Sequence, residues 1–146
     1  MPKRVGYLYD KMLDKDLIRF VILESARHKH RRHEVRKVLT HLEKYVEQTY
    51  KILSEGSFVP TRPKLKTIYD DSSQKRRELK IVPFWPDGIV HRLIVEAMKP
   101  VLMRGMHPYS CASIPERGGA RIRKYLAHAM RRDPKGTRYA CEMDIR

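Results

Sequence analysis

The chain has 146 residues, of which 32 are lysine or arginine and 17 are aspartate or glutamate, so its formal net charge is +15. Excess charge of this size opposes a compact state by self-repulsion, which favours a polyanionic partner. No apolar run approaches the roughly 20 residues of a membrane-spanning helix, no signal peptide follows Met1, and two cysteines make no disulfide framework; we expect a cytoplasmic, one-domain protein without a membrane partner.

The first third is expected to be helical. Apolar residues near helical spacing predict a helix over 14–28, and a longer stripe predicts one helix from Glu34 to Ser54, ended by Gly56. That stripe is Val35, Val38, Leu39, Leu42, Tyr45, Val46, Thr49, Tyr50 and Leu53. Between the two helices, the segment His28–His33 is interpreted as a solvated or RNA-facing turn, because its cations oppose a divalent metal ion.

The rest of the chain mixes strands and helices. Two prolines predict an extended segment over 58–63, followed by a β-hairpin of strands 65–69 and 78–83 around a polar loop. A helix is predicted from Pro86 or Asp87, kinked or ended by Pro100, and another over 120–132. The first of these should bury Ile89, Val90, Leu93, Ile94, Ala97, Met98, Val101 and Leu102. A turn over 133–136 and an apolar strand over 139–146 complete an α+β fold.

Four pieces of the chain, in this order, resemble bacterial and phage reverse transcriptases of the group II intron and diversity-generating retroelement kind. They are the predicted helix from Glu34 to Gly56 with the exit Phe58-Val59-Pro60, RRELKIVPFWPDGIVHRLIVEAMKPVL (76–102), HPYSCASIPERGGARIRKYLAHAM (107–130) and YACEMDIR (139–146). The resemblance covers roughly residues 10–146. It implies a helical lead-in over 1–56, polymerase fingers over 57–136 and the first palm strand of a right-hand fold over 137–146. This chain has Gly88 where the family usually has arginine, and it lacks the Tyr-x-Asp-Asp hairpin, the remaining palm and the thumb.

The resemblance implies the front part of an RNA-directed DNA polymerase, which uses an RNA template, a DNA primer, dNTPs and Mg²⁺. Asp144 matches the motif A aspartate and is the candidate catalytic residue and metal ligand, since Mg²⁺ prefers hard oxygen ligands. Ile145 would offer its backbone to the nucleotide. Arg77 matches the fingers arginine, whose guanidinium can fork onto triphosphate oxygens, and Lys75 and Arg76 are candidates for a second phosphate contact. The alternatives are an ordinary strand-end aspartate and a solvated basic hairpin tip.

A second group of candidates surrounds the predicted turn before the last helix. Arg117 and Gly119 could bring charge and backbone to a template phosphate, although a glycine pair before a helix is often only a turn. Arg121, Arg123 and Lys124 would extend the basic surface and attract nucleic acid in a salt-sensitive manner.

The remaining polar residues suggest no further chemistry. The histidines His91 and His128 are interpreted as core or boundary residues, and Cys111 and Cys141 as small buried side chains. By the resemblance, these 146 residues should bind nucleic acid without polymerising. The alternative function is a stand-alone basic RNA-binding module without catalysis, which needs only the charge and the amphipathic helices.

Overall fold

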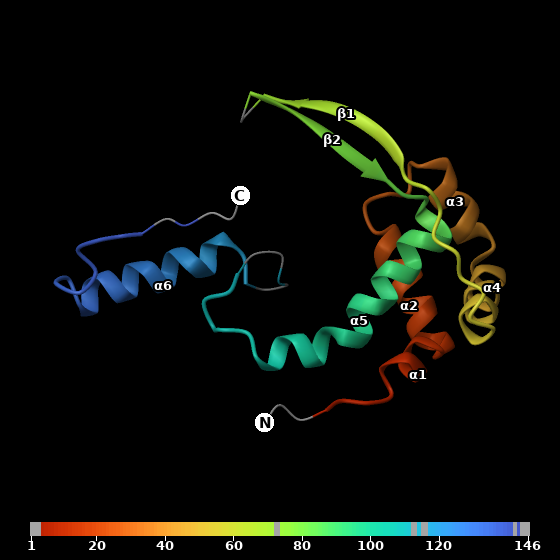
Figure 1. The fold of residues 1–146 in the computed structure, drawn as a ribbon, viewed down its shortest axis with the longest axis horizontal. Coiled ribbons are helices and arrows are strands. Elements are labelled where there is room, and N and C mark those ends of the chain that lie inside the picture. Colours follow the sequence, from red (N-terminus) through yellow and green to blue (C-terminus); the bar gives the residue numbers. More distant parts are fainter. Residues whose placement is uncertain (1–3, 72–73, 112–113, 115–116, 142, 144–146) are drawn as a thin grey trace. The chain divides into compact units, whose positions relative to one another are not determined.

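The computed structural model describes residues 4–71, 74–111, 114, 117–141 and 143. Within these ranges the chain forms helices and a two-stranded antiparallel sheet (Figure 1), which confirms the predicted α+β class. It divides into two compact units, residues 1–102 and 103–146. The predicted boundaries at 56 and 136 separate the lead-in, fingers and palm of a polymerase. The two compact units are defined by packing alone, so they do not test those boundaries.

The first unit opens with α1 (Leu8–Met12) and α2 (Lys15–Ala26). Asp14 caps α2, because its side chain accepts a hydrogen bond from the Asp16 amide at 2.9 Å. Four apolar side chains on one face of α2 are completely buried: Ile18, Val21, Ile22 and Ala26. The predicted helix over 14–28 is therefore confirmed, and it is slightly shorter than expected.

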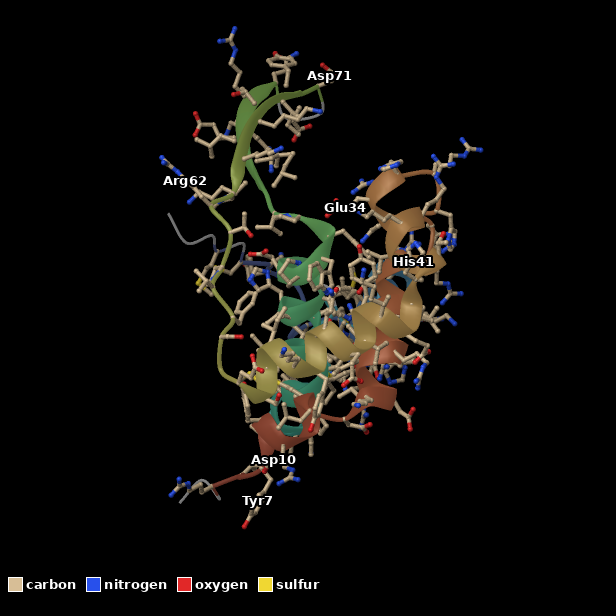
Figure 2. All side chains as sticks on the ribbon, turned by 90° about the vertical axis from the view of Figure 1, so that its right-hand side faces the viewer. Tyr7, Asp10, Glu34, His41, Arg62 and Asp71 are labelled. Atoms are coloured by element: carbon tan, nitrogen blue, oxygen red, sulfur yellow. The ribbon has the colours of Figure 1, made fainter. Side chains whose placement is uncertain are left out.

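The single helix predicted from Glu34 to Ser54 is wrong, because the structure contains two helices, α3 (His33–Thr40) and α4 (Leu42–Ser54). His41 lies between them with φ −120° and ψ 42°, which is not helical, and Figure 2 shows it at the corner. The Thr40 hydroxyl donates to the Arg36 carbonyl at 3.0 Å, a local bond that bends helices. The break leaves the apolar stripe buried on both helices, at Val35, Val38, Val46, Thr49 and Leu53.

Gly56 ends α4 as predicted. It adopts φ +62°, in the left-handed region that favours glycine. The Gly56 amide donates to the Leu53 carbonyl and the Ser57 amide to the Ile52 carbonyl, both at 3.0 Å. These two bonds form a Schellman motif, which satisfies carbonyls that the helix end leaves without partners.

Helices α2 and α4 pack together through apolar side chains and a charged edge. Arg19 on α2 makes a two-pronged contact with Glu43 on α4, with both nitrogen–oxygen distances 2.8 Å. Hydrogen bonds from Arg19 lower the pKa of the Glu43 carboxyl below its usual value of 4.5, and bonds from Glu43 and Asp16 raise the pKa of Arg19. Lys15 and Glu47 add a second ion pair at 2.6 Å.

The free energy of unfolding should depend on pH through the ion pair of Arg19 and Glu43. A carboxyl whose pKa falls on folding stabilises the folded state above its usual pKa, and this contribution disappears as the pH falls through the folded pKa. We therefore expect Glu43→Gln to destabilise the protein near neutral pH and to differ progressively less from the wild type below pH 4.5. Urea unfolding across this range measures the effect. Arg19→Gln should show the same convergence, and a difference that stays constant with pH would contradict the prediction.

The predicted hairpin is confirmed: β1 (Lys64–Asp70) pairs antiparallel with β2 (Lys75–Ile81). The second strand begins three residues earlier than predicted, because the ladder continues to the pair Asp70 and Lys75. Every residue of β2 is exposed, and Figure 1 shows the ribbon extending away from the helices of its own unit. A two-stranded ribbon is marginally stable by itself, so the position of the hairpin depends on its base.

The chain leaves β2 through the tight turn η1 (Phe84–Gly88) and enters α5 (Ile89–Arg104). Trp85 is extended, with φ −128° and ψ 139°, so the backbone turns helical only after it, at the predicted Pro86 or Asp87. The regular α-helix then begins at Ile89. It also continues past Pro100 rather than ending there. Residues buried on α5 are Ile89, Val90, Leu93 and Ala97, which join the core of α1 to α4. Three residues predicted to be buried are exposed, namely Ile94, Met98 and Leu102, because the apolar stripe is wider than the face that the core covers.

The second unit contains α6 (Gly119–Arg132), which confirms the predicted helix over 120–132. A turn follows, in which the Gly136 amide donates to the Asp133 carboxylate at 2.8 Å. The predicted closing strand is not formed at Tyr139–Cys141 or Met143, the residues of this segment that the structure describes. A strand needs a neighbour for its backbone hydrogen bonds, and the sheet found among the described residues holds β1 and β2 alone.

Candidate nucleic-acid interface

A buried carboxylate holds the base of the hairpin. Asp87 in η1 is 1% exposed, and it accepts hydrogen bonds from both the amide and the hydroxyl of Thr61, each at 2.8 Å. Thr61 lies three residues before β1, and Asp87 lies six residues after β2. These two hydrogen bonds, called the Asp87 clamp below, therefore join the segment that enters the hairpin to the segment that leaves it.

A second carboxylate ties the same turn to the helices. Glu34, in the first turn of α3, accepts the Phe84 amide at 2.7 Å and the Trp85 amide at 3.4 Å, and Figure 2 shows Glu34 beside the segment that leaves the hairpin. The Trp85 indole N–H donates to the Thr49 hydroxyl at 3.0 Å, while its ring meets Tyr45 edge-on at 5.0 Å between centroids. Together with the Asp87 clamp, these contacts fix the hairpin to α3 and α4.

Sequence reasoning misses both carboxylates as clamp residues. The local pattern indicates Asp87 only as the start of a helix and Glu34 only as part of a helical segment. The one local signal is Thr61, which lies between Pro60 and Pro63. The prolines keep this segment extended, so the Thr61 amide has no helical acceptor and needs another one. Nothing local in the sequence indicates that its acceptor lies 26 residues away.

The three predicted phosphate-binding cations lie at the free end of the hairpin. The register places Arg77 opposite Ile68, Arg76 opposite Tyr69 and Lys75 opposite Asp70. Since side chains alternate across a strand, Arg77 and Lys75 share one face, whereas Arg76 and the exposed Tyr69 share the other. The Arg77 guanidinium lies 2.9 Å from the Asp70 carboxylate, and the Arg77 side chain remains 56% exposed.

The second unit presents aromatic rings among cations. Arg121 donates to the Tyr125 hydroxyl at 3.2 Å, and its guanidinium lies 5.6 Å from the centre of that ring. Tyr125 stacks at a tilt on Tyr109, with centroids 4.7 Å apart, and Tyr109 meets His107 at 5.1 Å. Arg117 reaches the His107 carbonyl at 3.4 Å. Predicted residues Arg117 and Arg121 are thereby brought to one aromatic cluster.

The other predicted residues of this region lie along α6. Arg123 and Lys124 are exposed, and no side chain of this fully described helix is buried. Gly119 is the first residue of α6, and an added Cβ there would meet nothing within 4 Å. Neither Gly118 nor Gly119 has a positive φ. These glycines therefore leave the backbone at this turn accessible, and no left-handed conformation requires them.

The predicted metal ligand Asp144 and its neighbour Ile145 lie outside the described residues. Within the part of the chain that the structure describes, no three histidine, cysteine, aspartate or glutamate side chains group to hold a metal ion. A role for Asp144 in holding Mg²⁺ therefore stays a prediction from the sequence.

The predicted burial of Cys141 is wrong, because Cys141 is exposed, whereas Cys111 is buried as expected. His91 and His128, interpreted as core or boundary residues, are both exposed and therefore do not belong to a core. His91 lies on α5 away from its buried residues, and His128 lies on α6, where no side chain is buried, so apolar spacing alone did not reveal either exposure. Cys141 belongs to the closing segment that forms no strand, so no neighbouring strand covers it.

No protein-family model matches this chain, and no curated protein matches it either. None of the helices in the described part of the chain combines the length and the apolar composition that a membrane-spanning helix needs. The function must therefore be inferred from the chain's own surfaces. Those surfaces offer guanidinium and ammonium groups beside exposed aromatic rings, a combination that can bind phosphates and stack on bases.

Proposed function

We propose that this chain forms the fingers of an RNA-directed DNA polymerase, which contacts an RNA template, a DNA primer and the incoming dNTP. The observation that carries the proposal is the group of three consecutive cations, Lys75, Arg76 and Arg77, at the free end of a hairpin whose base is held by Asp87. Positioning and charge neutralisation are the main tasks of a protein in phosphoryl transfer. An anchored basic hairpin suits both tasks.

The two faces of the hairpin suit different parts of a nucleotide. Lys75 and Arg77 share one face and could bind neighbouring phosphates. On binding, the Arg77 guanidinium would exchange its contact with the Asp70 carboxylate for hydrogen bonds to the more highly charged triphosphate. Arg76 and Tyr69 share the other face, where an exposed ring beside a cation favours a base or a single strand. When bound, Mg²⁺ would neutralise charge developing on the phosphates, and Asp144 is proposed as one of its ligands.

The aromatic cluster of the second unit is proposed to contact template and primer. His107, Tyr109 and Tyr125 provide ring faces, and Arg117 and Arg121 lie beside them. Helix α6 contains five arginine or lysine residues and no acidic residue: Arg121, Arg123, Lys124, Arg131 and Arg132. Such a surface attracts phosphates with little regard to base sequence.

One observation favours the second candidate function, a basic RNA-binding module without catalysis. Tyr139 is 87% exposed and Met143 is 88% exposed, whereas a catalytic carboxylate at Asp144 calls for a stiff, buried strand beneath it. This module would bind RNA through the same cations without preferring a nucleoside triphosphate.

A nucleotide titration distinguishes the two functions. We expect dGTP to shift the amide resonances of Lys75–Arg77 and dGMP to bind about tenfold more weakly, because each charge-assisted hydrogen bond contributes about 1.5–3 kcal/mol. Arg77→Gln should abolish this preference. Lys64→Gln is the matched control, since Lys64 shares the face of Arg77 but lies at the anchored end of the hairpin. Equal affinities for dGTP and dGMP, with RNA still bound, would contradict the polymerase and favour the module.

A further inference from the structure

A second group of cations surrounds a cavity in the first unit, and it shares no residue with the three cations at the free end of the hairpin. The cavity has a volume of about 390 Å³ and is lined by parts of three elements. Arg27 directly follows the last residue of α2, His28 and Lys29 belong to the turn that comes next, and Arg92 lies in the first turns of α5. Glu24, Ser25, Phe84 and Gly88 complete the lining.

The charges at this cavity are mostly accessible. Arg27 lies 3.8 Å from Glu24, a long contact, and its side chain is 67% exposed. Arg92 is 45% exposed and pairs with Glu96 at 2.7 Å, a carboxylate that Lys99 also approaches at 3.4 Å. Within the described residues no carboxylate lies within ion-pair distance of Lys29. The lining therefore holds three cations against Glu24 alone, and this excess favours an anion.

The turn that supplies two of these side chains is well defined. His28 adopts φ +63°, in the left-handed region that histidine enters more readily than most residues. The Lys29 amide donates to the Ala26 carbonyl at 2.9 Å, and the Arg32 amide donates to the Lys29 carbonyl at 3.0 Å. These bonds hold the base of the Lys29 side chain, so less entropy is lost when it binds a ligand.

We infer that this cavity binds a phosphate group, either of a nucleic-acid backbone or free. The cations at the end of α2, in the turn and on α5 line different parts of the cavity wall. Such an arrangement can contact the tetrahedral oxygens of a phosphate from several sides, and it suits a phosphate better than a planar carboxylate. If the chain has the proposed function, a bound nucleic-acid strand gains a phosphate contact here that is separate from the hairpin. The identity of a nucleic-acid ligand rests on that proposed function. Phosphate binding itself requires neither polymerisation nor a metal.

Amide resonances of the complete chain, titrated with inorganic phosphate at constant ionic strength and then with a short single-stranded RNA, test this inference. We expect shifts at His28, Lys29 and Gly88. Lys29→Gln and Arg92→Gln should each weaken binding about tenfold, the loss of about one charge-assisted contact. Arg31→Gln is the matched control, because Arg31 lies in the same turn and carries the same charge but does not line this cavity.

Shifts with RNA alone would assign the cavity to backbone phosphodiesters, and shifts with both ligands would assign it to phosphate in general; either result supports the site. An Arg31→Gln variant that weakens binding as much as Lys29→Gln would overturn it, because general attraction depends on net charge and not on position. So would unchanged resonances at all three residues. Failure of the nucleotide preference at Lys75–Arg77, with these shifts intact, would instead reject the polymerase and leave the phosphate site standing.

Discussion

Replacing Asp87 by alanine is expected to lower the free energy of unfolding by about 2 kcal/mol, because the variant loses two hydrogen bonds from Thr61 to a buried carboxylate. The hairpin amides should also exchange with solvent faster, since the clamp joins both segments at the hairpin base. Trp85, the single tryptophan of the chain, lies two residues from Asp87 and reports urea unfolding of this region by fluorescence.

Asp71→Ala is the control for this variant. Asp71 is an exposed carboxylate at the tip of the hairpin (Figure 2), so its loss should change the free energy of unfolding by less than about 0.5 kcal/mol. If Asp87→Ala unfolds at the same urea concentration as the wild type, the clamp does not hold the hairpin.

The triple variant Lys75→Gln, Arg76→Gln, Arg77→Gln is expected to bind an RNA–DNA duplex about a hundredfold more weakly. Each lost phosphate contact should also reduce the slope of log affinity against log salt concentration by about 1, giving a total reduction of about 3. The fold should persist, because all three residues are exposed and the Arg77–Asp70 pair is a surface ion pair of small value. Fluorescence anisotropy at several salt concentrations measures both quantities.

The matched control removes the same charge from the other end of the same hairpin, as Lys64→Gln, Lys66→Gln, Lys80→Gln. The register places these lysines near the anchored base. We expect them to contribute general attraction but few direct phosphate contacts, so this variant should retain most of the wild-type affinity. Equal losses in the two triple variants would mean that the hairpin acts only through its net charge.

Local sequence signals located most of the elements. The apolar period of α2, the glycine that ends α4 and the alternation of the hairpin each act within a few residues, so the chain reveals them directly. The same signals failed at His41, where an apolar stripe continues through a backbone that turns. They also failed at Ile94 and Met98, because periodicity marks an apolar face without indicating whether a neighbour covers it.

The candidate site was predictable only in part. Clustering of Lys75, Arg76 and Arg77 follows from their adjacency in the chain, and their separation onto two faces follows from the strand period. The aromatic cluster around Tyr125 was not predicted, since Tyr109 lies 16 positions earlier and the intervening residues gave no regular pattern.

The sequence by itself determined the net charge, the α+β class, the positions of α2, α6 and the hairpin, and the basic character of the surfaces. Tertiary structure decided how the hairpin is anchored, through Asp87 with Thr61 and Glu34 with Phe84, and which cations surround the cavity at Lys29. The physical reason is the range of the interactions. Periodicity and turn chemistry act between near neighbours, whereas these hydrogen bonds join residues 26 and 50 positions apart and form only when the helices have packed.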